Sequence, residues 1–272
     1  MTEAVQLKGN LGDGSNGRAK SPGIWGDCPL TSILDGSITG IIVDDDFEGG
    51  GLITSPTASA ALVGVPYSGF GDTGSTITDA AELGGAIQLL SDGTEDDATS
   101  LFPLTTGFQA GLTTGPLWFE ARIKPSNIVA TGVNFFIGLC DNTAKDGDVP
   151  LTDSAGALAD LNCVGFRKPE SDLGSVRSCY KANTVTAVDV QTITSAIDTA
   201  TYVKLGFKKD VNGLLTFYVD GLPQTDTFQL LNDLGTGFPG DVRMGPCATL
   251  KVGAVTGAQT LIMDWWRCVQ LA

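Results

Sequence analysis

At 272 residues, the chain is long enough for one large β-sandwich, and its 36 glycines and abundant Thr and Val favour turns and strands over helices. Its formal net charge of −15 argues against nucleic-acid binding, because a phosphate backbone is bound by clustered Lys and Arg. The chain contains no histidine, which excludes Ser-His-Asp and Cys-His catalysis and zinc sites with imidazole ligands.

Residues 1–37 differ in composition from the rest of the chain. They are rich in Gly, Asn and Ser and have few periodic apolar positions, so they bury too little surface to fold alone. One interpretation is a disordered tail. The other is an extended arm that becomes ordered only on a neighbouring subunit. In that case the partner-binding anchors are Ile24, Trp25, Pro29, Leu30 and Ile33.

From residue 38 onward, short alternating or apolar runs between turn residues predict about a dozen strands, very little helix and one domain over residues 38–272. Long loops rich in Gly, Thr and Ala are expected at 54–78 and 141–161. The expected strands are 41–47, 85–90, 117–124, 134–141, 162–168, 176–182, 202–209, 214–219, 224–230, 242–248 and 260–269.

Large aromatic residues occur in two of these strands. Trp118 shares a face with polar residues in strand 117–124, and Trp265 and Trp266 must point to opposite faces if both lie in one strand. At most one of that pair can therefore lie in the main core. We expect Trp118 and Trp266 to be surface or interface aromatics; filling the sandwich core is the alternative.

The stretch Tyr218-Val-Asp-Gly221, which ends a strand of a predicted hairpin, resembles a signature of laminin-G-like domains, and the closing strand 261–267 resembles the last strand of that family. These matches, together with the order of the strands, cover residues 38–272. They imply an all-β, two-sheet antiparallel jelly-roll sandwich of the concanavalin-like kind. The composition of residues 1–37 adds an extended N-terminal arm to this fold. Fold alone does not fix function.

The stretch Phe119–Lys124 resembles a strand of β-glucanases that share this fold. In that family, catalysis belongs to a later strand in which two Glu flank an Asp, and retaining hydrolysis needs two carboxyl groups about 5 to 5.5 Å apart. Here strand 134–141 has no carboxylate before Asp141, and no two of the six Glu are two or four positions apart. We therefore predict no catalytic residues and no enzymatic activity.

Aspartate-rich turns offer oxygen ligands of the kind that calcium prefers. No other cofactor is expected. The six cysteines are predicted to be reduced thiols, because residues such as Cys140, Cys163, Cys179 and Cys268 lie inside predicted strands and the first eight residues lack the apolar run of an export signal. A disulfide framework is the alternative. The candidate calcium ligands are Asp44, Asp46, Asp141, Asp146 and Asp148.

No segment has the 18 or more apolar residues of a membrane span, so we expect no membrane association. An acidic sandwich with an arm and no catalytic set resembles the decoration and fibre proteins of tailed bacteriophages. This resemblance implies a virion protein, made in the host cytoplasm, whose arm binds the major capsid protein or other virion subunits and which forms a homo-oligomer, a trimer or dimer. The alternatives are a fibre adhesin that binds a host glycan and a free lectin-like protein, with calcium as an optional ligand.

Overall fold

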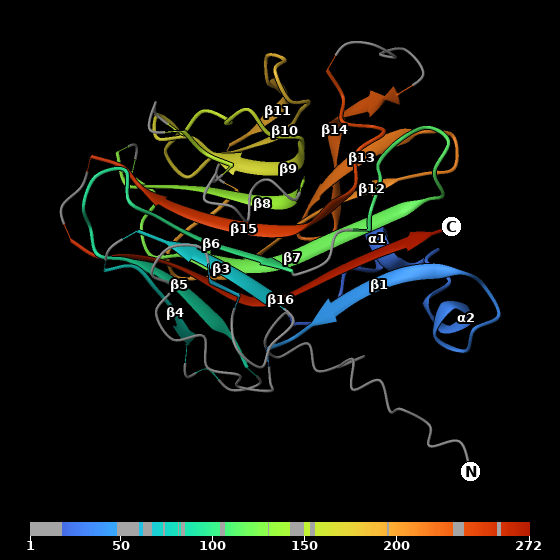
Figure 1. The fold of residues 1–272 in the computed structure, drawn as a ribbon, viewed down its shortest axis with the longest axis horizontal. Helices are drawn as coiled ribbons and strands as arrows, with labels where there is room; N and C mark the ends of the chain where they lie inside the picture. Colours follow the sequence, from blue (N-terminus) through green and yellow to red (C-terminus); the bar gives the residue numbers. More distant parts are fainter. Residues whose placement is uncertain are drawn as a thin grey trace.

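Alternating apolar side chains from two antiparallel sheets meet in one core, as the strand pattern predicts. Figure 1 shows the strands of the two sheets. Phe166 of one sheet meets Phe217 of the other edge-on, with ring centroids 5.4 Å apart. The two-sheet jelly-roll sandwich is therefore confirmed. The computed structural model describes residues 18–47, 60–61, 67–72, 74–80, 82, 85–103, 107–129, 131–141, 150–152, 156–194, 196–230, 237–254 and 257–272.

The first sheet, sheet A, carries the C-terminal strand near its centre. Its strands lie in the order β14 (Leu222–Gln229), β13 (Leu214–Val219), β12 (Val203–Lys209), β7 (Leu117–Pro125), β16 (Gln259–Leu271), β5 (Ile87–Ser91) and β4 (Thr76–Asp79), and β1 (Gly40–Asp45) pairs with the C-terminal part of β16.

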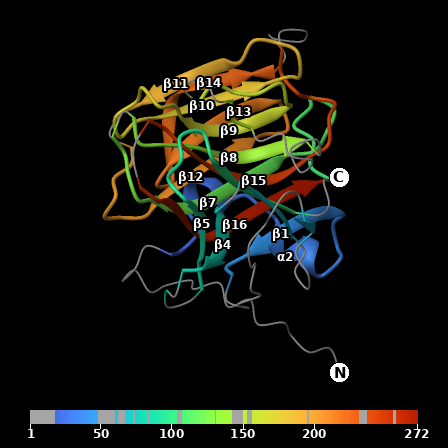
Figure 2. The same cartoon turned by 60° about the vertical axis from the view of Figure 1, so that its left-hand side comes forward.

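The second sheet, sheet B, lies across the core from sheet A (Figure 2). Its order is β11 (Val188–Ile193), β10 (Val176–Lys181), β9 (Cys163–Lys168), β8 (Val133–Asp141), β15 (Met244–Val252), β6 (Ala98–Pro103), β3 (Tyr67–Gly71) and β2 (Ala60–Ala61).

All eleven expected strands are present, with ends shifted by up to four residues, but β2, β3, β4, β6 and β11 were not predicted. The expected loop 54–78 is wrong in part, since β2 and β3 lie within it and β4 begins in it. β11 alternates at Val188 and Val190 but was still missed. The other missed strands are short and made largely of Ala, Gly, Ser and Thr, so their sequences carry little alternation. They become strands because a neighbouring strand pairs with their backbone groups.

Residues 18–37 do not form the expected extended arm. They contain two short helices, α1 (Pro22–Trp25) and α2 (Leu30–Leu34), and lie on the outer face of sheet A. Ile24 is fully buried there against Trp118, Tyr218 and Val269. Gly206 makes room for it, because a Cβ at that position would lie 2.5 Å from the Ile24 Cδ1 atom.

The remaining predicted anchors also face the sandwich of the same chain. Trp25, Leu30 and Ile33 are partly buried and pack against the Ile24 cluster, and Pro29 precedes α2 as its N-cap. The extended conformation was excluded by tertiary packing: sheet A offers an apolar strip that these residues cover, and their burial offsets the entropy lost on ordering.

The positions predicted for the two tryptophans are also wrong. Trp118 lies under α1 and Trp266 lies in the main core, and both are almost completely buried. In the pairing of β16 with β7, Met263 faces Ile123 and Trp265 faces Arg122, so Asp264 is an extra residue that forms a β-bulge. The bulge reverses the alternation, and Trp266 points inward instead of Trp265.

Among the described residues, no helix is long and apolar enough to cross a membrane.

Replacing Ile24 with Ala should lower the free energy of unfolding by about 2–5 kcal/mol, because the truncation leaves a cavity between α1 and sheet A. Leu34→Ala is the matched control, since the Leu34 side chain is half exposed and its truncation should have little effect. Urea denaturation followed by circular dichroism measures both. Equal effects of the two substitutions would mean that α1 does not pack on the sandwich in solution.

Candidate functional site

The outer face of sheet B is covered by the chain's own residues. Phe136 and Cys140 of β8, with Cys163 of β9, point away from the main core and form a second apolar cluster. Leu151, Leu158 and Leu161, which follow β8 in the chain, complete this cluster. Strands β8, β9 and β15 are consequently buried on both faces, and their central part offers no open apolar surface to a ligand.

The same face carries no pair of carboxylates on the inner strands β8 and β9. The residues of β9 that point outward are Cys163, Gly165 and Arg167, because Val164 and Phe166 lie in the main core. On β8, the outward residues that precede Asp141 are Asn134, Phe136, Gly138 and Cys140. Neither set supplies the two acidic groups that glycoside hydrolysis requires.

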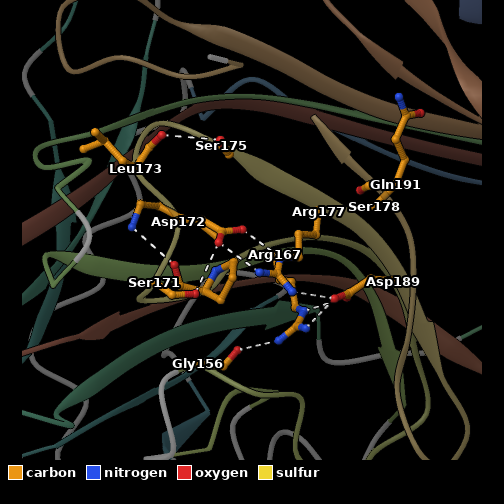
Figure 3. Close-up of polar contacts among 12 residues, drawn as sticks. Gly156, Arg167, Ser171, Asp172, Leu173, Ser175, Arg177, Ser178, Asp189 and Gln191 are labelled. Carbon is orange, nitrogen blue, oxygen red and sulfur yellow. Dashed lines mark hydrogen bonds and ion pairs between the residues drawn. The ribbon is translucent and has the colours of Figure 1, made fainter. Parts of the chain in front are cut away.

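A cluster of two arginines and two aspartates lies at the β9–β10–β11 end of this face (Figure 3). Arg167 binds Asp189 with two hydrogen bonds, from Nε at 3.0 Å and from Nη2 at 2.8 Å, and its Nη1 donates to the Gly156 carbonyl. Arg177 binds Asp172 in the same two-pronged manner, at 2.7 and 2.9 Å, and reaches Asp189 through Nη1 at 2.9 Å. Asp189 therefore joins the two arginines.

The cluster keeps both carboxylates ionised. The hydrogen bond from Arg177 lowers the pKa of Asp172. Burial raises the pKa of Asp189, but the hydrogen bonds from Arg167 and Arg177 outweigh burial and leave it below its usual value. A carboxylate that is ionised and fully paired at neutral pH cannot act as a general acid. The side chains of Arg177 and Asp189 keep 27% and 26% of their surface exposed, so polar ligands can reach them.

A second set of buried charges lies on the outer face of sheet A, beneath residues 18–25. Glu120 accepts hydrogen bonds from the Ser21 backbone N–H at 3.1 Å and from the Trp25 indole N–H at 2.6 Å. Burial raises the pKa of Glu120. Arg122 and Arg18 both pair with Asp264, the bulge residue. These contacts hold the N-terminal segment on the sheet.

The predicted calcium ligands do not converge. Asp44 lies in sheet A, where it pairs with Arg267, whereas Asp141 lies at the end of β8 in sheet B and accepts hydrogen bonds from Asn162. Asp46 follows β1, and Asp146 and Asp148 lie outside the described residues. Within the described ranges, no group of three His, Cys, Asp or Glu side chains is arranged to hold a metal ion.

Buried lysines bind backbone carbonyls at the loops, a role that oxygen-ligated cations can also fill. Lys209 Nζ donates to the Gly111 and Thr114 carbonyls, each at 2.7 Å, and Lys168 Nζ donates to the Val133 carbonyl at 2.9 Å. Burial lowers the pKa of each of these two lysines to about 8.

Sequence reasoning missed the arginine–aspartate cluster. Arg167 and Arg177 lie in predicted strands, but Asp189 lies in β11, which was not predicted, and Asp172 lies in the connection between β9 and β10. The signal in the sequence was the presence of two arginines, ten positions apart, in two strands expected to pair as a hairpin. Two cations placed side by side in this way indicate that an acidic partner lies nearby.

Asp189→Asn should lower the free energy of unfolding at pH 7 by about 1–3 kcal/mol, because Arg167 and Arg177 lose a charged acceptor. The pKa of Asp189 is depressed in the folded state, so its contribution is present above the unfolded pKa of about 3.9 and disappears as the pH falls through the folded pKa. Urea denaturation should therefore show a lower free energy of unfolding for Asp189→Asn than for the wild type at pH 7. Near pH 2 the two free energies of unfolding should be nearly equal. The control is Asp160→Asn, whose mostly exposed ion pair with Lys181 should matter much less. A pH-independent difference would contradict this account.

No protein-family model matches this sequence, and no curated protein sequence matches it either. Solved structures do share the fold. A protein of unknown function from Shewanella oneidensis MR-1 is 14% identical, with a TM-score of 0.55 over 90% of this chain and 94% of that one. Peanut lectin is 16% identical, with a TM-score of 0.54 over 85% and 97% of the two chains. The endo-β-1,3-glucanase of Pyrococcus furiosus is 11% identical, with a TM-score of 0.56 over 85% and 94%. The chain therefore has the concanavalin-like jelly-roll fold that lectins and glucanases use.

Proposed function

We propose that this protein is a non-enzymatic structural component of a virion, and specifically a capsid decoration protein of a tailed bacteriophage. The observation that carries the proposal is the state of the acidic groups on both outer faces. On sheet B, Asp172 and Asp189 are neutralised by arginines, and on sheet A, Glu120 and Asp264 lie beneath the N-terminal segment. A folded surface without free acid–base chemistry suits a protein that works by assembly.

We assign shell binding to the region of the chain that carries the exposed apolar residues Leu34, Ile38 and Ile41, which are 51%, 41% and 44% exposed. It lies at the end of α2 and the start of β1, next to the C-terminus of the described chain (Figure 1). Within the described residues, β1 pairs only with β16, so its other edge is free to bind a partner strand. Leu34, Ile38 and Ile41 are exposed and can contact a partner, whereas the predicted anchor Ile24 is buried in its own chain.

The acidic composition supports the same proposal. With a net charge of −15, free copies repel one another, so association needs a specific apolar contact or a basic partner surface. The major capsid protein or another virion subunit is the proposed partner, and a trimer or dimer at a symmetric shell position is the proposed assembly.

The alternative function is carbohydrate binding, as a free lectin-like protein or as a fibre adhesin. It is favoured by one observation on this chain: Arg177 and Asp189 form a rigid, partly exposed pair of planar polar groups (Figure 3). Such groups bind sugar hydroxyls. The fold shared with peanut lectin is compatible with this reading, and the fold shared with endo-glucanases keeps hydrolysis among the activities to test.

The double substitution Ile38→Asp and Ile41→Asp should abolish association with the capsid, because two charges would be buried in the contact. Quantitative mass spectrometry of purified particles would give the copy number relative to the major shell subunit, and we expect a loss of at least about tenfold. Val211→Asp is the matched control, since Val211 is also highly exposed but lies on the β12–β13 turn. Absence of the wild-type protein from particles would refute the proposal, and equal binding by the double variant would refute the assigned surface.

Incubation with β-1,3-glucan at pH 4 to 8 should release no reducing sugar, because the central strands of sheet B carry no acid–base pair. A glycan array should likewise show no specific binding. Release of reducing ends that Asp189→Asn abolishes would instead identify a hydrolase. Glycan binding that Arg177→Ala abolishes, while circular dichroism stays unchanged, would favour the lectin alternative.

A further inference from the structure

Four of the six cysteines form a row across neighbouring strands on the outer face of sheet B. In strand order they are Cys247 in β15, Cys140 in β8, Cys163 in β9 and Cys179 in β10. All four belong to the apolar cluster under Leu151, Leu158 and Leu161, and all are free thiols. Nothing in the arginine–aspartate cluster or in the proposed assembly surface uses them.

The pairing register distinguishes one pair from the others. Cys140 lies directly opposite Cys163. Cys247 lies opposite Gly138, so it is diagonal to Cys140, and Cys179 lies opposite Gly165, so it is diagonal to Cys163. Diagonal neighbours on a sheet are about 7–8 Å apart, which is beyond the Cα separation of about 4.4–6.8 Å that a disulfide spans. Only Cys140 and Cys163 face each other directly.

The backbone hydrogen bonds show that this pair is of the close type. The Asp141 backbone N–H donates to the Asn162 carbonyl at 3.0 Å, so residues 141 and 162 form a hydrogen-bonded pair. Pair types alternate along an antiparallel ladder, so Cys140 and Cys163 form a non-hydrogen-bonded pair. Cα atoms in such a pair are typically about 4.5 Å apart, within the range for a disulfide.

Two further observations agree with this close approach. Gly138 and Gly165 face each other two positions along the same ladder, and a Cβ on Gly138 would lie only 2.6 Å from the Gly165 Cα atom. The Cys140 thiol also lies within hydrogen-bonding reach of the Cys163 thiol, and of the Cys247 thiol on its other side.

We propose that Cys140 and Cys163 are a redox pair that closes to a cross-strand disulfide when the protein meets a disulfide oxidant such as oxidised glutathione. One thiolate attacks the oxidant, forming a mixed disulfide and releasing one reduced glutathione. The second thiolate then attacks the protein sulfur of that mixed disulfide and releases the other. The two protein thiols lose two electrons and two protons, and one oxidised glutathione becomes two reduced molecules.

The bond would fasten the two strands that flank residues 141–162, from which the apolar cover of this face comes. Burial raises the pKa of the Cys140 thiol, so the pair reacts slowly while the cover is in place. Oxidation therefore takes place during folding or on transient opening of the cover, and once formed the disulfide restrains the unfolded chain. The oxidised protein should melt about 5–10 °C higher than the reduced protein.

The test is to refold the full chain from urea with and without millimolar oxidised glutathione, block free thiols with N-ethylmaleimide and digest with trypsin. Cleavage at Arg122, Lys145 and Arg167 places Cys140 and Cys163 in separate peptides, so the disulfide appears as one linked pair in the mass spectrum. We expect that pair and a raised melting temperature. Both should disappear in Cys140→Ala and in Cys163→Ala.

Cys179→Ala is the matched control, since Cys179 is equally buried on the same face but diagonal to Cys163; it should keep the link and the shift. Circular dichroism of the reduced variants establishes that each one folds. If a substitution prevents folding, the linked peptides of the wild-type protein decide the question alone. Six blocked thiols after refolding in oxidised glutathione, or a link from Cys140 to Cys247, would overturn the proposal.

Discussion

The arrangement of this sandwich depends on the pairing of β16, a 13-residue strand that β7 flanks on one side and β5 and β1 flank on the other. The extra residue at Asp264 changes which side chains of this strand point inward. Beyond the bulge, Trp266 enters the core and packs between Phe47 and Tyr67, with ring centroids 5.9 and 5.6 Å away. Tyr67 belongs to sheet B, so this aromatic contact joins the two layers.

The bulge also determines what lies on the opposite face. Asp264 and Trp265 both point outward, where Asp264 pairs with Arg18 and Arg122, and Lys20 lies 4.0 Å above the Trp265 ring. Contacts to Arg18 and Lys20, together with those from Glu120 to Ser21 and Trp25, attach the N-terminal segment to sheet A. Charged groups buried in this way are stable only because each finds an oppositely charged or hydrogen-bonding partner.

Both outer faces are thus covered by the chain itself, one by residues 18–34 and the other by Leu151, Leu158 and Leu161. The two regions proposed above to bind partners or ligands lie at the edges of the sheets: the exposed apolar residues beside β1, and the arginine–aspartate cluster at the β11 end of sheet B. Arginines engage Asp44, Asp172, Asp189 and Asp264, and these ion pairs help to hold the shape of the sandwich. The thiol row adds a covalent means of strengthening that shape at the β8–β9 pair.

The sequence alone determined the fold class and eleven of the strands, because alternation within a segment such as 117–124 depends only on local periodicity. Within a regular strand such as 117–124, it also determined which residues share a face. It did not determine what covers that face: Ile24, read as an anchor for a partner, is buried in its own chain, and Trp266 points inward because of a bulge that no local pattern signals. The Arg167–Asp189–Arg177 cluster likewise depends on β11, which was not predicted although Val188 and Val190 alternate with Asp189 and Gln191, and on the pairing that brings Asp189 to both arginines. These features come from contacts between residues far apart in the chain, and only the tertiary structure decides which distant segments meet.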